Sequence, residues 1–280
     1  MKVGVNVAVN SNTGDVGAFA KKAEDLGFQS LWMAEHPIMP VHTTSKYGGT
    51  PDGSIPPAMS DMADPFISLA IASGTTSKIK LGTSICLIPE HNPLVQAKQI
   101  AALDYHSGGR FIFGIGTGWV REETEIMGGD FDHRWTRAKE AIEAMKEMWT
   151  KDEAEYHGHY FDFPKVRVFP KPAQKPYPPV FLGGAAANVF KRVVNYGDGW
   201  MPVRATPDGV RAGRAALDEL SDAAGRDPKS IQILIYGASS REEIKQMEDA
   251  GADMATVRLE STDPDKVMDG LEKLAEEMLG

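Results

Sequence analysis

The sequence has little cysteine, no long hydrophobic segment and no excess of positive charge, and each absence excludes a class of protein. The single cysteine, Cys86, cannot form an internal disulfide, which fits a reducing compartment. No segment is apolar enough to span a bilayer, and Met1–Val5 is interpreted as a first strand rather than a signal peptide. The formal charge of −9 disfavours nucleic-acid and anionic-membrane surfaces. We therefore expect a cytoplasmic protein that acts on a small molecule.

Motifs of several enzyme classes are also missing. The glycine-rich stretch Arg110–Trp119 lacks the Gly-x-Gly-x-x-Gly spacing of dinucleotide-binding domains, because Trp119 follows Gly118 directly. No Gly-x-Ser-x-Gly or Ser-His-Asp arrangement is found. His157 and His159 have no convincing third and fourth ligand nearby, so we expect a surface hairpin there and no metal site. The chemistry must therefore be sought elsewhere.

An alternation of β-type and helical segments runs along the whole chain and predicts an α/β fold. The expected strands are Val3–Val9, Ser30–Ala34, Ile79–Ile85, Phe111–Ile115, Val180–Leu182, Trp200–Val203, Ile231–Tyr236 and Ala255–Leu259. The helix after the third strand is well marked, since Asn92 suits its N-cap and Pro93 its first position. Eight strands joined by helices favour a (β/α)8 TIM barrel, a single domain over residues 1–280. A doubly wound sheet is the alternative.

Two connections are longer than a bare barrel needs. Pro37–Ala63 follows the second strand, on the face where barrel active sites lie. Lys151–Pro178 comes after the helix that follows the fourth strand, so most of it is expected to return along the opposite face. Long ordered insertions in compact domains are usually lids or binding loops.

The ends of the expected strands supply the candidate catalytic residues. His36 follows the second strand, and a histidine exchanges protons near neutral pH. The alternative is a half-buried histidine that hydrogen-bonds the loop. Glu35 either orients His36 or pairs with a lysine of a neighbouring helix, and both interpretations stay open.

Small residues after the fourth and fifth strands suit a phosphate. Gly183, Gly184 and Ala185 are expected to start a helix directly after a strand, where backbone N–H groups and the helix dipole bind anions. Thr117 adds a hydroxyl near the same place. The alternative is a tight turn that needs small residues.

Several ordered motifs resemble one family. Leu81–Ile85, His91–Val95, Ser107–Trp119 and Pro170–Gly184 are similar to segments of the luciferase-like monooxygenase superfamily, and most similar to its branch that depends on coenzyme F420, a deazaflavin. The likeness runs from the first strand to about Val203 and weakens beyond it.

The resemblance implies a (β/α)8 barrel that holds a flavin or deazaflavin across its C-terminal face. It implies a non-proline cis peptide at Ser84–Ile85 against the ring and places His36 opposite the redox-active part of that ring. Sugar-phosphate dehydrogenases of this branch carry an acidic residue where Trp119 stands, and a tryptophan where Pro40 falls. Trp119 therefore indicates an apolar or aromatic wall beside the ring. The implied cofactor-binding residues are Ser84, Ile85, Gly116, Thr117, Gly118, Gly183, Gly184 and Ala185.

The expected function is hydride transfer between C5 of coenzyme F420 and a small organic substrate. His36 supplies or removes the accompanying proton, with Glu35 and Trp119 beside it. One alternative is an FMN-dependent monooxygenase served by a separate flavin reductase. Another is a flavin- or deazaflavin-binding protein without turnover. The family resemblance also implies a homodimer.

Overall fold

The barrel predicted from the sequence is confirmed. The computed structural model describes residues 1–186, 188–259, 263 and 266–280. In that part of the chain eight parallel strands follow the order β3-β2-β1-β11-β10-β9-β8-β5, and pairing of β5 with β3 closes the barrel. The strands are β1 (Lys2–Val7), β2 (Ser30–Met33), β3 (Lys80–Thr83), β5 (Phe111–Gly116), β8 (Val180–Gly183), β9 (Gly199–Met201), β10 (Gln232–Ala238) and β11 (Met254–Arg258). A two-residue strand, β4 (Cys86–Leu87), pairs with the end of β5.

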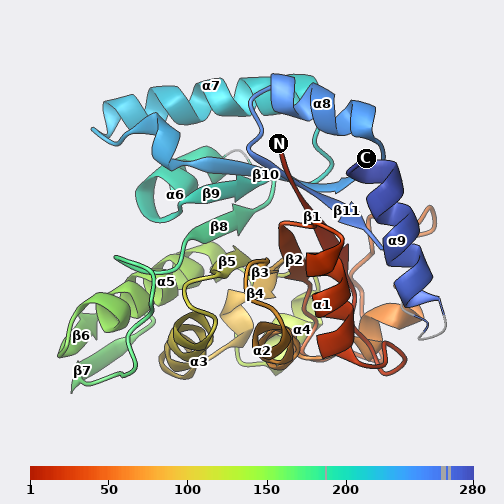
Figure 1. Cartoon of the computed structure of the whole chain (residues 1–280). Helices are drawn as coiled ribbons and strands as arrows, with labels where there is room; N and C mark the ends of the chain where they lie inside the picture. The colour runs from red at the N-terminus through yellow and green to blue at the C-terminus, as the bar shows by residue number, and fades with distance from the viewer. Residues whose placement is uncertain (187, 260–262, 264–265) are drawn as a thin grey trace.

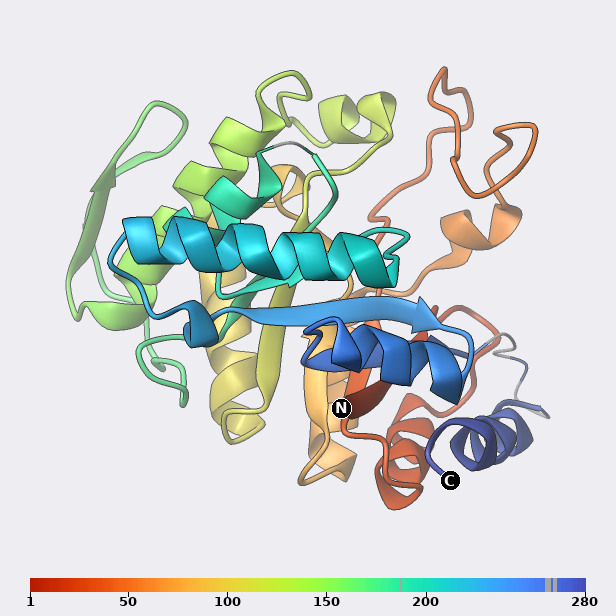
Figure 2. The same ribbon diagram turned by 90° about the horizontal axis from the view of Figure 1, so that it is seen from above.

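Helices surround the barrel, with α7 and α8 on one side and α1 to α3 on the other (Figures 1 and 2). Asn92 caps α3 as predicted, since its side chain accepts hydrogen bonds from the N–H groups of Leu94 and Val95. The described helices are α1 (Val16–Asp25), α2 (Pro65–Thr75), α3 (Pro93–His106), α4 (Arg121–Ile126), α5 (Arg134–Thr150), α6 (Val189–Tyr196), α7 (Pro207–Ala223), α8 (Arg241–Asp249) and α9 (Val267–Met278). Within the described ranges, no helix is long and apolar enough to cross a membrane.

Successive side chains of each strand point to opposite faces of the sheet, so the hydrophobic core consists of two clusters. In β5, Phe111, Phe113 and Ile115 belong to the large cluster between barrel and helices, whereas Ile112 belongs to the small cluster inside the barrel. Burying a large apolar side chain contributes roughly 1.5–3 kcal/mol, so the two clusters together fix the strand register. The inner cluster consists of Trp32, Ile112, Phe181, Met201, Leu234 and Met254, with Ile85 packed against it.

The two long connections lie in different places. Residues 37–63 project from the face at the carboxyl ends of the strands (Figure 2). In the other connection, β6 (Ala154–His157) and β7 (Asp162–Val166) form an antiparallel hairpin that packs against α5. Nδ1 of His157 is bonded to Asp162, so the predicted surface hairpin is confirmed. The Gln174 side chain then donates to the Phe111 carbonyl at the start of β5, which places this segment at the amino ends, as expected.

Candidate active site

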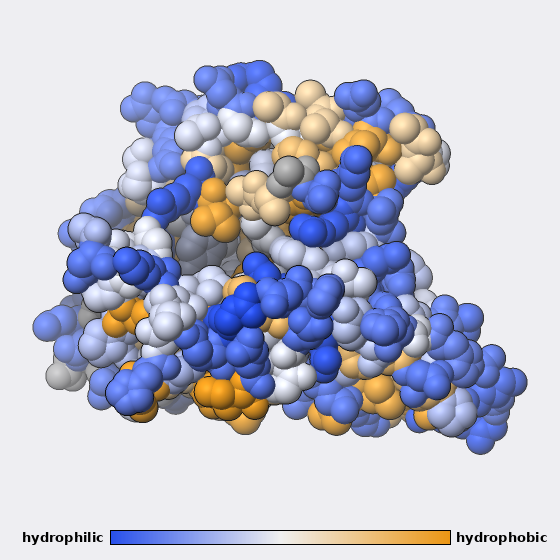
Figure 3. Space-filling view, turned by 180° about the vertical axis from the view of Figure 1, so that it is seen from behind, coloured by the Kyte–Doolittle hydropathy of each residue, from blue (hydrophilic) through white to orange (hydrophobic). Residues whose placement is uncertain are grey.

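The face at the carboxyl ends of the strands is hollowed near its middle (Figure 3). The Ser84–Ile85 peptide bond at this end of β3 is cis, as the resemblance implies. A Cβ on Gly116 would lie 1.9 Å from Cδ1 of Ile85, and one on Gly183 would lie 3.2 Å from its Cγ2. Gly116 and Gly183 were expected to contact a cofactor, but the side chain that needs their space is Ile85.

His36 is held by a partner that the sequence did not reveal. Its Nδ1 lies 2.8 Å from Oε2 of Glu123, and both side chains are almost fully buried. Because an ionised carboxylate only accepts hydrogen bonds, this contact places a proton on Nδ1. Nε2 has no hydrogen-bond partner in the described part of the chain and keeps its lone pair for a ligand. His36 therefore has the geometry of an oriented acid or base.

Glu35 has neither of the two roles weighed for it. Its Oε2 accepts from the N–H of Leu87 at 2.7 Å, and its Oε1 lies 2.7 Å from Nε2 of His91. Ligating atoms of Glu35, Cys86 and His91 lie within 4.8 Å of one another. Burial raises the pKa of the Cys86 thiol well above its usual value, and its sulfur accepts from Gln96. With hydrogen bonds inside the protein for each group, this cluster holds β4 and the residues after it in place.

A third buried carboxyl, Glu90, lies close enough to Glu123 to feel its charge. Its Oε1 accepts from the Thr124 hydroxyl at 3.0 Å, and its side chain is buried. Burial, and then the charge of Glu123, raise the pKa of Glu90 to about 8. A Cβ on Gly118, which has φ +75°, would lie 3.2 Å from both Glu90 Oε1 and Thr124 Oγ1. Gly118 is therefore required for the close approach of its loop to these side chains.

An aromatic wall stands beside His36. The Trp119 ring lies edge-on to the His36 ring at a centroid distance of 5.9 Å, and the Tyr47 ring lies 5.5 Å from Trp119. Tyr47 belongs to the insertion after β2, which the sequence marked as a binding loop without naming this residue. The contact gives Trp119 the environment expected of an apolar wall.

The insertion is tied to other loops of the same face. The Glu122 carboxylate accepts hydrogen bonds from the hydroxyls of Thr43 and Ser45 and from both the N–H and the hydroxyl of Thr44. The backbone N–H of Thr44 is the first of the contacts that lower the pKa of Glu122 to about 2. Arg204, after β9, donates to the Gly48 carbonyl. These contacts hold Tyr47 where it meets Trp119.

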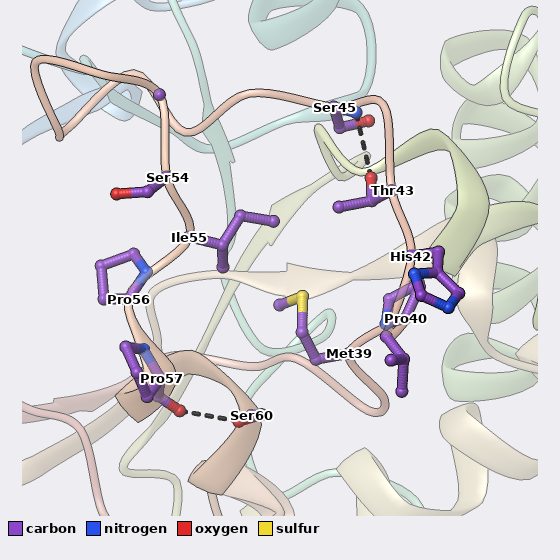
Figure 4. Close-up of a pocket in the computed structure, with 12 residues that line it drawn as sticks. Met39, Pro40, His42, Thr43, Ser45, Ser54, Ile55, Pro56, Pro57 and Ser60 are labelled. Atoms are coloured by element: carbon purple, nitrogen blue, oxygen red, sulfur yellow. Dashed lines mark hydrogen bonds between the residues drawn. The ribbon is translucent and has the colours of Figure 1, made fainter.

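A cavity of about 440 Å³ lies within the insertion itself. Met39 and Ile55 point into the space between its two limbs, which the prolines at 40, 56 and 57 border (Figure 4). All its lining residues belong to the range 39–60, so none of the strand-end residues line it. A second cavity, of about 530 Å³, is lined by Lys2, Lys80 and Gln232 at the amino ends of the strands, on the opposite face.

The loop after β8 differs from the prediction. Helix α6 begins at Val189, so Gly183, Gly184 and Ala185 do not start a helix directly. The Gly184 N–H donates to the Met201 carbonyl at 3.1 Å and is therefore already used within the protein. Gly184 itself has φ +127°, and no atom lies within 4 Å of where its Cβ would be. This open space and the exposed Ala185 leave room for a ligand against the loop backbone.

From β10 and β1, a chain of polar side chains reaches the cis peptide. The Tyr236 hydroxyl donates to Oδ1 of Asn6 at 2.9 Å, and Nδ2 of Asn6 donates to Oγ of Ser84. Burial raises the pKa of Tyr236, so its hydroxyl stays protonated near neutral pH. The chain fixes Ser84 beside Ile85, and nothing in the sequence pattern connects these three residues.

Comparison with known proteins identifies the class. Residues 2–267 match the family model described as luciferase-like monooxygenase, so the chain belongs to this family and is a luciferase-like oxidoreductase. It is 37% identical over 214 residues to an uncharacterized protein of Mycobacterium tuberculosis, covering 75% of this chain and 74% of that protein.

Two named relatives use different cofactors. An F420-dependent hydroxymycolic acid dehydrogenase of Mycobacterium tuberculosis is 27% identical over 217 residues, covering 76% of this chain and 55% of the relative. An FMNH2-dependent dimethylsulfone monooxygenase of Pseudomonas putida is 34% identical over 151 residues, covering 50% of this chain and 41% of the relative. The family thus includes proteins that use a deazaflavin and proteins that use a flavin.

Solved structures share the fold. A monooxygenase from Streptomyces bottropensis has a TM-score of 0.79 at 19% identity, covering 100% of this chain and 99% of that one. A coenzyme F420-dependent tetrahydromethanopterin reductase from Methanopyrus kandleri has a TM-score of 0.77 at 18% identity, covering 99% and 98%. At such identities the likeness establishes the luciferase-like barrel.

Proposed function

We propose that this protein transfers a hydride between coenzyme F420 and a small organic substrate. The observation that carries the proposal is His36, whose Nδ1 is fixed by buried Glu123 while Nε2 is left for a ligand. Moving a hydride to or from a carbon–oxygen or similar bond requires a matching proton, and an oriented histidine supplies or accepts it. The sequence resemblance to the F420-dependent branch and the F420-dependent relative support this choice of cofactor.

Residues that follow β3, β5 and β8 fit a tricyclic cofactor with a phosphate-bearing tail. Ser84 and Ile85 present the cis peptide, and Ser84 is held by Asn6. Thr117, Gly118, Gly184 and Ala185 come from the loops after β5 and β8, where the space beside Gly184 is open. The deazaflavin, when bound, supplies the hydride chemistry, and the protein supplies orientation and exclusion of water.

The chain's own residues divide the remaining tasks. Nε2 of His36 gives a proton to the substrate or removes one, while Glu123 holds the ring in a single tautomer. Trp119 and Tyr47 cover one side of the site with apolar surface and keep water from the reacting atoms. Glu35 is a positioning residue for β4 through Leu87 and His91.

A second candidate is an FMN-dependent monooxygenase that receives reduced FMN from a separate reductase. The FMNH2-dependent relative favours it, and the residues proposed to hold a deazaflavin suit a flavin ring equally. Reduced FMN would supply the oxygen chemistry, and His36 would have the same protonic role. A third candidate, cofactor binding without turnover, predicts that replacing His36 alters no measured reaction.

Titration with oxidised coenzyme F420 and with FMN, followed by tryptophan fluorescence, tests the proposal. We expect micromolar binding of the deazaflavin and weaker binding of FMN. Micromolar binding of FMN with no response to the deazaflavin contradicts it. Oxygen consumption that requires reduced FMN and substrate would instead support the monooxygenase.

A further inference from the structure

A group of three side chains next to the cis peptide, here called the β4 cluster, combines a carboxylate, a thiol and an imidazole. Ligating atoms of Glu35, Cys86 and His91 all lie within 4.8 Å of one another. Glu35 and Cys86 are buried, whereas the His91 side chain is 19% exposed and gives the cluster its contact with solvent. Carboxylate, thiolate and imidazole are the ligands of protein zinc sites, while Mg²⁺ and Ca²⁺ prefer oxygen alone.

The three side chains of the β4 cluster are held on separate, well-fixed segments. Glu35 follows β2, Cys86 belongs to β4, which pairs with β5, and His91 follows a single turn of 3₁₀ helix. The Leu87 N–H donates to Oε2 of Glu35, and the Phe66 ring lies edge-on to the His91 ring at a centroid distance of 6.3 Å. A ligand set held in this way loses little conformational freedom when an ion binds.

Helix α3 contributes a fourth possible ligand. Gln96 is 1% exposed, and its Nε2 donates to Sγ of Cys86 at 3.0 Å, while its Oε1 has no hydrogen-bond partner in the described part of the chain. A half-turn about the Cγ–Cδ bond exchanges the places of the amide oxygen and nitrogen, which have nearly the same shape. A cation beside the sulfur therefore gives this buried carbonyl oxygen a partner that the protein does not supply.

The charge of the β4 cluster also favours a cation. Within the described ranges, Glu35 pairs with His91 and with no lysine or arginine. Burial, then the charge of Glu35 and a hydrogen bond to it, raise the pKa of the Cys86 thiol, which is therefore neutral. With a neutral thiol, the cluster carries the net charge of one buried carboxylate. A divalent cation bound by one carboxylate and one thiolate brings this net charge to zero.

We propose that the β4 cluster binds one Zn²⁺ in a four-coordinate site that the amide oxygen of Gln96 completes. The ion replaces the proton between Oε1 of Glu35 and Nε2 of His91, and Oε2 keeps the Leu87 N–H. The two atoms, now 2.7 Å apart, then separate to the roughly 3.3 Å that ligands at about 2.0–2.1 Å from a tetrahedral zinc require. The thiol loses its proton to solvent, and the imidazole proton moves by exchange from Nε2 to Nδ1.

The position of this site in the chain gives it a structural role. Cys86 directly follows the cis peptide, and Glu35 directly precedes His36. An ion bound to both therefore ties together two segments that carry residues of the candidate active site. The zinc site does not depend on the proposed function, because none of its ligands takes part in the proposed hydride transfer.

The first test titrates the metal-free full chain, without an affinity tag, with Zn²⁺ by calorimetry and with Co²⁺ by absorption. We expect one equivalent of Zn²⁺ to bind with a Kd on the order of 1 µM or below. Co²⁺ should show a thiolate-to-metal charge-transfer band and the intense visible bands of a tetrahedral ion, whereas Mg²⁺ should give no response. Absence of Zn²⁺ binding, or Co²⁺ binding without the charge-transfer band, would overturn the proposal.

The second test replaces ligands. Cys86→Ser should abolish the charge-transfer band and weaken zinc binding by about 100-fold or more, and His91→Gln, which retains a donor for Glu35, should weaken it similarly. Circular dichroism shows whether each variant folds. His157→Gln is the matched control, since it removes an exposed imidazole bonded to Asp162 and should leave both titrations unchanged. Unweakened binding in the two cluster variants would place the ion elsewhere and overturn the proposal.

The third test uses pH and heat. Because binding releases the thiol proton, Kd should rise about tenfold as the pH falls from 8 to 7, whereas a surface site of imidazole and carboxylates would change little there. Free zinc at about 100 times Kd should raise the melting temperature of wild type by about 5 °C, and a chelator should reverse the rise. An equal rise in Cys86→Ser would contradict the assignment of the ion to this cluster.

Discussion

Two histidine–glutamate pairs lie near the carboxyl ends of β2 and β3, and they differ in what surrounds the imidazole. His36 is bonded to Glu123 through Nδ1, and its ring lies edge-on to that of Trp119. His91 is bonded to Glu35 through Nε2, and the same carboxylate accepts from the backbone of Leu87. Each imidazole uses one nitrogen for its glutamate, but His36 lies beside Trp119, whereas Glu35 joins His91 to the backbone of Leu87 and so ties two segments of chain together. Similar residues thus serve chemistry in one place and structure in the other.

The largest expected difference comes from replacing the two histidines. His36→Asn retains a donor for Glu123 but has no titratable nitrogen, so turnover should fall by about 10²–10⁴-fold. His91→Gln retains a donor for Glu35 and should leave turnover per folded molecule within about threefold. Steady-state kinetics with coenzyme F420, alongside circular dichroism, would compare them. Equal losses in the two variants would remove the functional distinction between the pairs.

The glutamates of the two pairs should differ in the same way, with Glu123 affecting turnover more than Glu35 does. Glu123→Gln no longer dictates the tautomer of His36, and we expect a loss of about 10–100-fold in kcat with little change in KM. Nitrogen NMR of the histidine ring would detect the accompanying change of tautomer, which a purely structural role would not produce. An unchanged kcat together with an unchanged tautomer would argue that Glu123 does not orient His36.

Glu35 should influence stability more than chemistry. Glu35→Ala leaves the Leu87 N–H and the His91 ring without their acceptor, at a cost of roughly 1–3 kcal/mol in the free energy of unfolding. Urea denaturation would measure it. Asp25→Ala removes an exposed carboxylate from a surface pair with Lys21 and should change stability by less than about 0.5 kcal/mol. Comparable losses of stability in the two variants would contradict the conclusion that Glu35 holds β4 and the residues after it in place.

The smallest effect is expected at Glu122, a half-buried carboxylate next to Glu123 in the chain. Its folded-state pKa of about 2 lies below its usual 4.5, so its contribution is present above about pH 4.5 and is lost as the pH falls through about 2. Between pH 5 and 9, Glu122→Ala should therefore speed hydrogen exchange at Thr44 by a pH-independent factor and leave the melting temperature almost unchanged. Exchange as slow as in wild type would mean that Glu122 does not hold the insertion.

All eight barrel strands were predictable, because each is a short β-type segment bounded by helical ones. His36 and Trp119 were predictable as well, since they directly follow or lie close to strand ends. The partner of His36 was not, because Glu123 is 87 positions away in an acidic segment typical of an exposed helix. One weak signal existed. Glu123 and Thr124 follow the buried Val120 at helical spacing and share its buried face.

The glycines show a different limit of sequence reading. Gly116 and Gly183 match a ligand-binding pattern, but their missing side chains accommodate Ile85. The side chain of Ile85 lies between two neighbouring strands, directly after a cis bond that was expected from the family resemblance rather than from any local pattern. A glycine in a strand indicates that another group comes close to the backbone, but it does not show whether that group is a ligand or a side chain of the protein. The choice between deazaflavin and flavin, the homodimer and the separate reductase remain predictions.

The anchoring of the insertion has a consequence for how this protein can be engineered. The insertion that carries Tyr47 is hydrogen-bonded to Glu122 of α4 and to Arg204 in the loop after β9. A loop grafted into this position would keep the anchoring only if it offered hydrogen-bond donors to Glu122 and a carbonyl to Arg204. An engineered exchange of the insertion therefore has to preserve these contacts or replace all three segments together.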